Sequence, residues 1–247
     1  MKVTFVGTGD AFNSGGRHHA CLRVDAGGNT LAVEFGGTAL LGWKELGFST
    51  DDIDAIIISH LHGDHFGGLP FLLLDCHFAR RRTKPLVLVG PKGFQARLNV
   101  ALEAFYPGSS KLNWHFLLRF VEVAPDKPRS LLGFTLDVFE VDHPSGAPSY
   151  GLRLTADNKV LGFSGDTAWT PTLVDIADGA DMFVCECYSG HPKMSNHIDW
   201  PNLKEQIGKF KSKRIVLTHM GETALPLIPE FTAAGLTPAH DGLVVEL

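Results

Sequence analysis

The sequence has few cysteines, no long apolar segment and no excess of positive charge. None of its four cysteines forms a C-x-x-C pair, so a metal site would have to use imidazole and carboxylate groups, and we expect the thiols to serve packing. No run approaches the roughly 18 apolar residues of a membrane helix. Because 22 Lys and Arg stand against 27 Asp and Glu, a net charge of −5, the surface as a whole cannot bind polyanions generically.

The start of the chain carries no recognisable targeting signal. Residues 3–7 form a strand-length run that ends in Gly7, which is shorter than the roughly 7–15 apolar residues of a signal peptide. With so few cysteines, this start predicts a cytoplasmic protein with reduced thiols and no membrane partner.

Short apolar runs punctuated by glycine alternate with helical stretches along the whole chain. Strands are predicted at 3–6, 21–24, 30–35, 53–59, 86–89, 135–141, 150–155, 159–163, 182–187, 214–218 and 243–247. Helices are predicted at 38–46, 67–81, 93–105, 170–177, 200–211 and 229–234. This alternation predicts a layered α/β or α+β architecture with helices outside the sheets, and no linker divides residues 1–247, which we expect to form one domain. A loop is expected at 124–128, which holds two prolines.

The sequence is rich in histidine, with 12 residues, and their densest group is His60-Leu61-His62-Gly63-Asp64-His65 after the apolar run 55–59. In extended backbone His60 and His62 point the same way, and a turn at Gly63 brings Asp64 and His65 round. Two metal positions can thus be served. A simpler interpretation, solvated loop histidines, is hard to reconcile with four ligand-type residues within six positions.

Three later apolar strands also end in ligand-type residues, namely His143, Asp166 and His219. Functional residues gather at one edge of a rigid scaffold, so we expect these ends to converge on the first group. Five histidines and two aspartates suffice for two divalent ions that share one carboxylate. These ligands suit zinc, with manganese or iron as alternatives. Two such ions roughly 3.5–4 Å apart can hold a bridging hydroxide, which predicts hydrolysis.

The pattern H-x-H-x-D-H followed by distant His, Asp and His resembles the metallo-β-lactamase superfamily from residue 3 to residue 219. The resemblance implies an α+β fold, a four-layer αβ/βα sandwich of two mixed sheets with helices on both outer faces. It also implies a partition of the ligands. One metal would be bound by His60, His62 and His143, the other by Asp64, His65 and His219, and Asp166 would bridge them.

Several segments are similar to the ribonuclease Z branch and its small phosphodiesterase relatives: 5–12, 64–70, 86–93, 149–153 and 163–167. In that branch a Glu and a later His act together, and Glu186 and His197 occupy the corresponding positions. The resemblance implies that Glu186 orients His197, which donates a proton to the leaving oxygen, while Asp64 positions or deprotonates the nucleophile.

The chain departs from that branch around Glu186, where Cys185 replaces a histidine and Cys187 and Tyr188 replace Ala-Thr. It also lacks the long Gly/Pro-rich basic insertion that grips tRNA. We therefore expect a small or short nucleotide phosphodiester as substrate rather than tRNA.

Other functions remain open from the sequence. The same chemistry serves a carbon-ester hydrolase such as a lactonase, thioesterase or β-lactamase, whereas a scaffold protein would have lost ligands and none is missing. The basic runs 80–84 and 209–214 could meet phosphates, but such runs are usually solvated, so RNA is not favoured as a partner. A homodimer also stays open.

Overall fold

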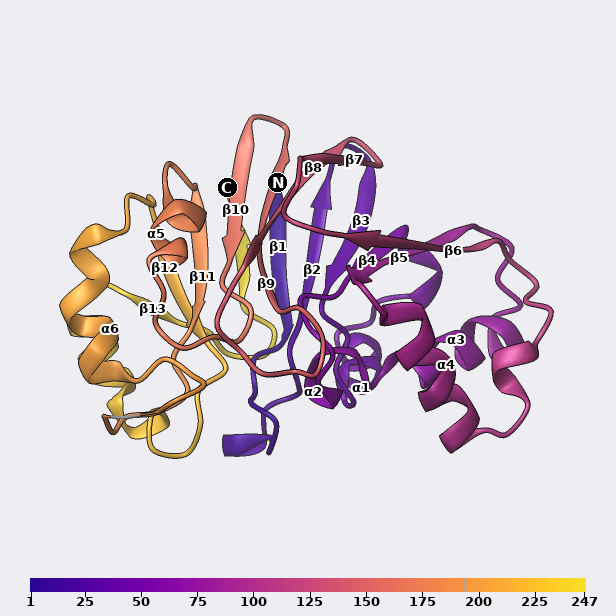
Figure 1. Cartoon of the computed structure of the whole chain (residues 1–247), viewed down its shortest axis with the longest axis horizontal. Helices are drawn as coiled ribbons and strands as arrows, with labels where there is room; N and C mark the ends of the chain where they lie inside the picture. Colours follow the sequence, from indigo (N-terminus) through magenta and orange to yellow (C-terminus); the bar gives the residue numbers. More distant parts are fainter. Residues whose placement is uncertain (193) are drawn as a thin grey trace.

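The computed structural model describes residues 1–192 and 194–247, which fold into two mixed seven-stranded sheets (Figure 1). The first sheet has the order β14 (Val244–Glu246), β1 (Lys2–Gly7), β2 (Cys21–Ala26), β3 (Asn29–Val33), β4 (Ala55–Ile57), β5 (Leu86–Pro91), β6 (Leu118–Val123). The second has the order β13 (Thr237–Pro238), β12 (Ile215–Thr218), β11 (Met182–Glu186), β10 (Lys159–Phe163), β9 (Tyr150–Ala156), β8 (Phe134–Glu140), β7 (Arg129–Leu131). Each sheet contains parallel and antiparallel neighbours.

The fold has four layers, two sheets and two sets of helices, and an apolar cluster lies at each of the three boundaries between them. One lies between the sheets and joins side chains such as Phe5 of β1 to Leu152 of β9. The second packs the outer face of the first sheet against α1, α3 and α4, and the third packs the second sheet against α5, α6 and α7. The helices are α1 (Ala39–Glu45), α2 (Gly63–Phe66), α3 (Leu69–Leu74), α4 (Phe94–Phe105), α5 (Thr172–Ala177), α6 (Trp200–Gln206) and α7 (Ile228–Ala233). The expected αβ/βα sandwich is confirmed.

The strands that carry the site are apolar along their length because both of their faces are covered. Every residue of β4 and β11 is buried, as expected for strands between two layers. Helix α4 instead shows helical spacing, since Phe94, Leu98 and Leu102 lie four residues apart and are all buried.

The structure differs from the predicted elements in several places, and the short strands β7 and β13 were not predicted. The helix predicted at 67–81 is shorter, with α3 followed by a π turn at Asp75–Ala79, and a separate short helix, α2, begins at Gly63 inside the histidine motif. The strand predicted to reach Ser59 ends at Ile57. Strand β6 was not predicted, because it lies at the edge of its sheet and most of its side chains are half-buried or exposed, which removes the apolar pattern.

The prediction that the basic run 80–84 is solvated is wrong for Arg82, whose side chain is only 2% exposed. Its guanidinium donates hydrogen bonds to four backbone carbonyls, those of Thr50, Ile53, Lys84 and Pro85. These bonds tie the turn before β4 to the loop before β5. The side chain is therefore structural.

Replacing Arg82 with Met is expected to lower the free energy of unfolding by about 3 kcal/mol, because two buried and two part-buried carbonyls lose their donor. Urea denaturation followed by circular dichroism measures this. Arg81→Met is the matched control, since Arg81 is exposed and its removal should change stability by less than about 0.5 kcal/mol. Equal midpoints for the two variants would contradict the structural role.

All four cysteines are buried and unpaired, as expected for packing residues. Among the described residues, no helix is both long enough and apolar enough to cross a membrane.

Candidate metal centre

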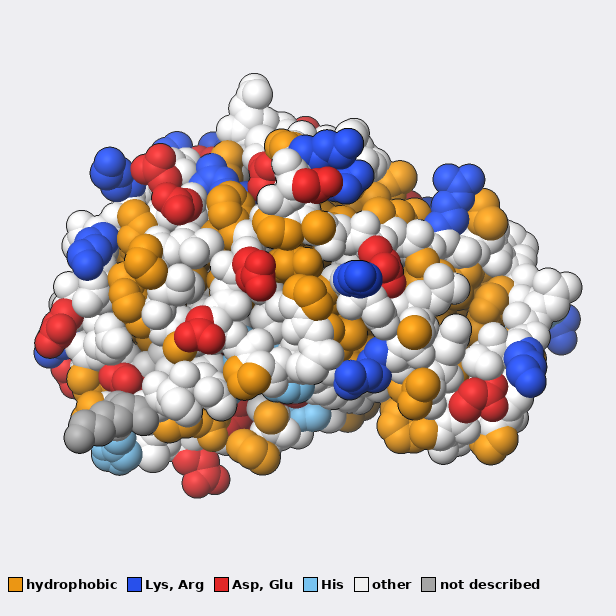
Figure 2. All heavy atoms as spheres, viewed as in Figure 1, with side chains coloured by type: hydrophobic (Ala, Val, Ile, Leu, Met, Phe, Trp, Pro, Cys, Tyr) orange, Lys and Arg blue, Asp and Glu red, His pale blue; other side chains and the backbone are white. Residues whose placement is uncertain are grey.

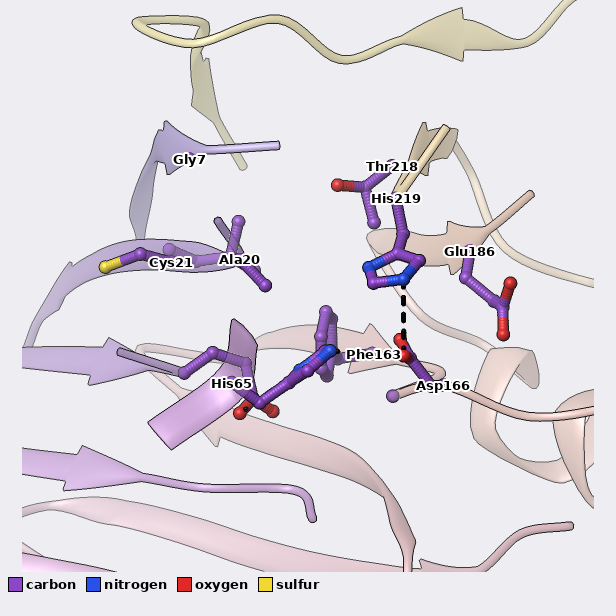
Figure 3. Close-up of a pocket in the computed structure, with 12 residues that line it drawn as sticks. Gly7, Ala20, Cys21, His65, Phe163, Asp166, Glu186, Thr218 and His219 are labelled. Carbon is purple, nitrogen blue, oxygen red and sulfur yellow. Dashed lines mark hydrogen bonds and ion pairs between the residues drawn. The ribbon is translucent and has the colours of Figure 1, made fainter. Parts of the chain in front are cut away.

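The ends of four strands from both sheets meet at one edge of the sandwich. The motif 60–65 follows β4 of the first sheet, whereas His143, Asp166 and His219 follow β8, β10 and β12 of the second. Figure 3 shows His65 on one side and Asp166 with His219 on the other, pointing toward one another. Histidine side chains reach the surface at the lower centre of the face in Figure 2.

The ring nitrogens of His60, His62 and His143 form the first group of ligand atoms. All three lie within 4.8 Å of one another, and the distance from Nδ1 of His62 to Nε2 of His143 is 3.0 Å. His60 is completely buried, and its Nε2 has no hydrogen-bond partner among the described residues.

The second group contains Asp64, His65, Asp166 and His219, all buried. Oδ2 of Asp166 lies 3.1 Å from Nε2 of His65 and 3.3 Å from Nε2 of His219. The same oxygen lies 3.8 Å from Nε2 of His60 in the first group. Asp166 therefore stands between the two groups, where a bridging carboxylate would have to be.

These spacings suit divalent ions. Bonds of about 2.0–2.1 Å in tetrahedral geometry place ligand atoms roughly 3.3 Å apart, close to the 3.0–3.8 Å found between neighbouring ligand atoms here. The charged side chains of the second group also interact directly with one another. Although burial opposes it, the carboxylates of Asp166 and Asp64 raise the pKa of His65 well above its usual value.

Neighbouring polar groups orient two of the histidine rings. Nδ1 of His143 donates to the carbonyl of Asn196 at 2.8 Å, which leaves Nε2 unprotonated and facing the cluster. Nδ1 of His60 lies 2.9 Å from Oγ of Ser59. Such partners set the tautomer of a metal-binding histidine.

The backbone at the site adopts uncommon conformations. His219 has φ 56° and Gly165, which precedes Asp166, has φ 60°. A Cβ on Gly165 would lie 2.6 Å from the carbonyl oxygen of Tyr150, so only glycine fits there. These conformations aim His219 and Asp166 at the cluster.

Glu34, a completely buried carboxylate behind His65, was not predicted from the sequence. It follows β3 with φ 63°. Its Oε1 accepts the amide of Ser59 at 3.0 Å, and its Oε2 lies 3.5 Å from Nδ1 of His65. A carboxylate facing Nδ1 keeps the proton there and leaves Nε2 free as a ligand. The sequence feature that could have indicated its role is a charged residue directly after the apolar run 31–33.

Replacing Glu34 with Gln is expected to weaken metal binding about 10- to 100-fold. Because Ser59 donates to the oxygen of the new amide, its NH₂ group must face Nδ1 of His65 and donate to it. The proton of the imidazole then moves to Nε2, which cannot bind a metal. Zinc affinity measured by competition with a chelator tests this.

Glu140→Gln is the matched control, since Glu140 is an exposed carboxylate on β8, and its zinc affinity should equal that of the unsubstituted protein. Unchanged zinc affinity in the Glu34 variant would show that Glu34 does not orient His65.

Glu186 and His197 lie together beside the cluster, as the family resemblance implied. Glu186 is 1% exposed, and its Oε1 lies 3.0 Å from Nδ1 of His197. The carboxylate also accepts the amides of Thr167 and Ile198. The ring of His197 stacks on that of His219 with centroids 5.5 Å apart.

This pair favours a protonated imidazole. Burial raises the pKa of Glu186 to about 7. Although burial alone would lower it, the carboxylate of Glu186 raises the pKa of His197 to about 9. His197 is thus equipped to give up a proton near the cluster.

Known proteins are similar to this chain in sequence or in structure. Ribonuclease Z from Lachnoclostridium phytofermentans is 26% identical over an alignment of 271 positions, gaps included. The alignment covers 89% of this chain and 87% of that protein. The metallo-β-lactamase fold protein YhfI from Bacillus subtilis matches with a TM-score of 0.79 and 20% identity over 99% of both chains. A diphosphatase of the PhnP family matches with a TM-score of 0.80 and 19% identity over 100% of this chain and 97% of that one.

The fold and the His/Asp cluster define a metal-dependent hydrolase of the metallo-β-lactamase superfamily, near ribonuclease Z. A family model described as Anti-Pycsar protein Apyc1 matches residues 1–241. The chain belongs to that family.

Proposed function

We propose that this protein is a dinuclear-metal-dependent phosphodiesterase that cleaves a small or short nucleotide phosphodiester. The observation that carries the proposal is the Glu186–His197 pair beside the cluster, with Nδ1 of His197 3.9 Å from Oδ2 of Asp166. A proton donor at that place matches the need of an alkoxide leaving group, which departs slowly unless it is protonated.

The ligand groups are assigned as the resemblance implies, with His60, His62 and His143 for one ion, Asp64, His65 and His219 for the other, and Asp166 shared. When bound, two divalent ions would supply a bridging hydroxide as nucleophile and neutralise phosphoryl charge. The imidazole and carboxylate ligands favour zinc, with manganese or iron as alternatives.

The protein's own groups do the rest. Oδ2 of Asp64 lies 3.3 Å from Nε2 of His65 and faces the cluster, where it positions or deprotonates the nucleophile. His197 donates its proton to the departing oxygen, and Glu186 holds the ring in orientation.

The names of similar proteins support phosphorus chemistry, since they include a ribonuclease and a diphosphatase. The alternative is a carbon-ester hydrolase, because the same nucleophile attacks carbonyl groups. Metal-loaded protein should hydrolyse bis(p-nitrophenyl) phosphate faster than a panel of lactones and thioesters. No turnover of the phosphodiester with zinc, manganese or iron(II) would overturn the proposal, and preferential lactone or thioester cleavage would favour the alternative.

We also propose a cytoplasmic location, which four buried free thiols support because reducing compartments keep thiols unpaired. Cell fractionation with a compartment marker tests it.

A homodimer is the assembly we propose. Phe71, Phe105 and Tyr106 are 38–54% exposed and their rings gather around Phe71, with centroid distances of 5.5 and 6.0 Å. Exposed aromatic clusters of this kind are typical of interfaces.

Light scattering should give a dimer mass for the unsubstituted protein and a monomer mass for Phe105→Ser, while the exposed control Val244→Ser stays dimeric. A monomeric mass for the unsubstituted protein would refute this.

A further inference from the structure

A recess of about 670 Å³ opens beside the cluster and has no part in the chemistry described above. Tyr188 connects it to the site, since the Tyr188 ring lies with its centroid 4.8 Å from that of His197 and 6.1 Å from that of His219. A substrate whose phosphate lies at the cluster would therefore extend into this recess.

The Tyr188 ring is held in place by its surroundings. A Cβ on Gly221 would lie 3.0 Å from Cε2 of Tyr188, which is tighter than an ordinary contact. The amide of Gly221 donates to the backbone carbonyl of Tyr188 at 3.0 Å. The absence of a side chain at Gly221 thus allows the ring to stand against the two histidines.

Phe12 forms a second aromatic wall of the recess and is 77% exposed. Its loop is nevertheless well defined. The buried carboxylate of Asp10 accepts the amides of Phe12 and Ser14 and the hydroxyl of Ser14. An ordered turn that presents a large apolar ring to water suits a surface that a ligand covers.

The acidic side chains among the described residues that line the recess do not favour a phosphate as its occupant. Among the described residues that line it are two carboxylates, those of Asp10 and Glu222, and no lysine or arginine. The Asp10 oxygens are occupied by the loop, whereas the exposed Glu222 carboxylate has no hydrogen-bond or ion-pair partner among the described residues. A flat, uncharged ring with N–H donors is the group that such a recess fits.

We infer that this recess binds the nucleobase of the substrate, with Phe12 and Tyr188 as stacking faces and Glu222 as an acceptor for base N–H groups. The inference rests on the proposed function, because it places the scissile phosphate at the cluster. Stacking of one base on an aromatic side chain corresponds to about a 5- to 100-fold change in affinity.

Calorimetric titration of the metal-loaded protein compares the four common ribonucleoside 5′-monophosphates with ribose 5-phosphate, which lacks a base. At least one nucleotide is expected to bind about tenfold or more tightly than ribose 5-phosphate. Phe12→Ala should remove at least fivefold of that preference and leave the affinity for ribose 5-phosphate unchanged. Tyr188→Leu should act in the same direction.

Phe78→Ala is the matched control, since Phe78 is an aromatic ring 63% exposed on the distant π turn, and it should keep the full preference. Equal affinity for all five compounds, or a preference that survives both recess variants, would overturn the inference. Turnover of bis(p-nitrophenyl) phosphate is measured separately. A base preference without turnover would overturn only the proposed function. Turnover without a base preference would overturn only the inference that the recess binds the nucleobase.

Discussion

Replacement of Asp166 with Asn is expected to lower phosphodiester turnover by more than about 1,000-fold and to reduce the bound metal from about two ions per chain to one or none. The reason is the place of its Oδ2, which lies 3.1–3.8 Å from Nε2 of His60, His65 and His219. Asparagine keeps the shape but removes the negative charge that two cations would share. Turnover of bis(p-nitrophenyl) phosphate and metal analysis by mass spectrometry measure both effects.

The matched control is Asp142→Asn, since Asp142 is an exposed neighbour of His143, and it should keep both ions and turnover within about twofold. An Asp166 variant that retains two ions and turns over within tenfold of the unsubstituted protein would remove Asp166 from the bridging position.

Replacement of His197 with Ala is expected to lower kcat by about 100- to 10,000-fold for a substrate with a nucleoside leaving group. The loss should be much smaller for bis(p-nitrophenyl) phosphate, because p-nitrophenolate departs without protonation. Metal content should not change. Glu186→Gln should reproduce most of the nucleoside-selective loss, since it removes the carboxylate that holds Nδ1 of His197.

Two outcomes would contradict a proton-donating His197. Equal losses on both leaving groups would show that His197 does not protonate the departing oxygen. Loss of metal would make it a ligand, because its ring nitrogens also lie within reach of His143 and Asp166. His240→Ala serves as the control, since His240 is exposed and should leave both activities unchanged.

Part of the site is formed by residues that are close together in the sequence. His60, His62, Asp64 and His65 lie within six positions, so the end of a strand and the start of α2 bring their side chains together. The end of each later strand could likewise be read from its apolar run. Spacing along the chain does not give the distance between ligands that are about a hundred residues apart. Nε2 of His65 and Oδ2 of Asp166 are such a pair, and they lie 3.1 Å apart.

The misses have physical causes. Glu34 directly follows β3 of the first sheet, and its role depends on how His65 returns over that strand through α2. Arg82 belongs to a basic run that is otherwise exposed, and the burial of its side chain follows from the packing of two loops. Strand β6 pairs with β5 at an exposed edge, where few apolar side chains are needed.

The sequence by itself determined the chemical nature of the site, because ligand type, strand-terminal position and local spacing are properties of short segments. It also determined the layered fold class through the alternation of apolar strands and helices. Only the tertiary structure decided that Asp166 stands between two ligand groups, that Glu34 backs His65 and that a recess walled by Phe12 and Tyr188 opens beside them. These relations depend on the order of strands in two sheets and on the packing between the sheets, and contacts so distant along the chain leave no periodic pattern in the sequence.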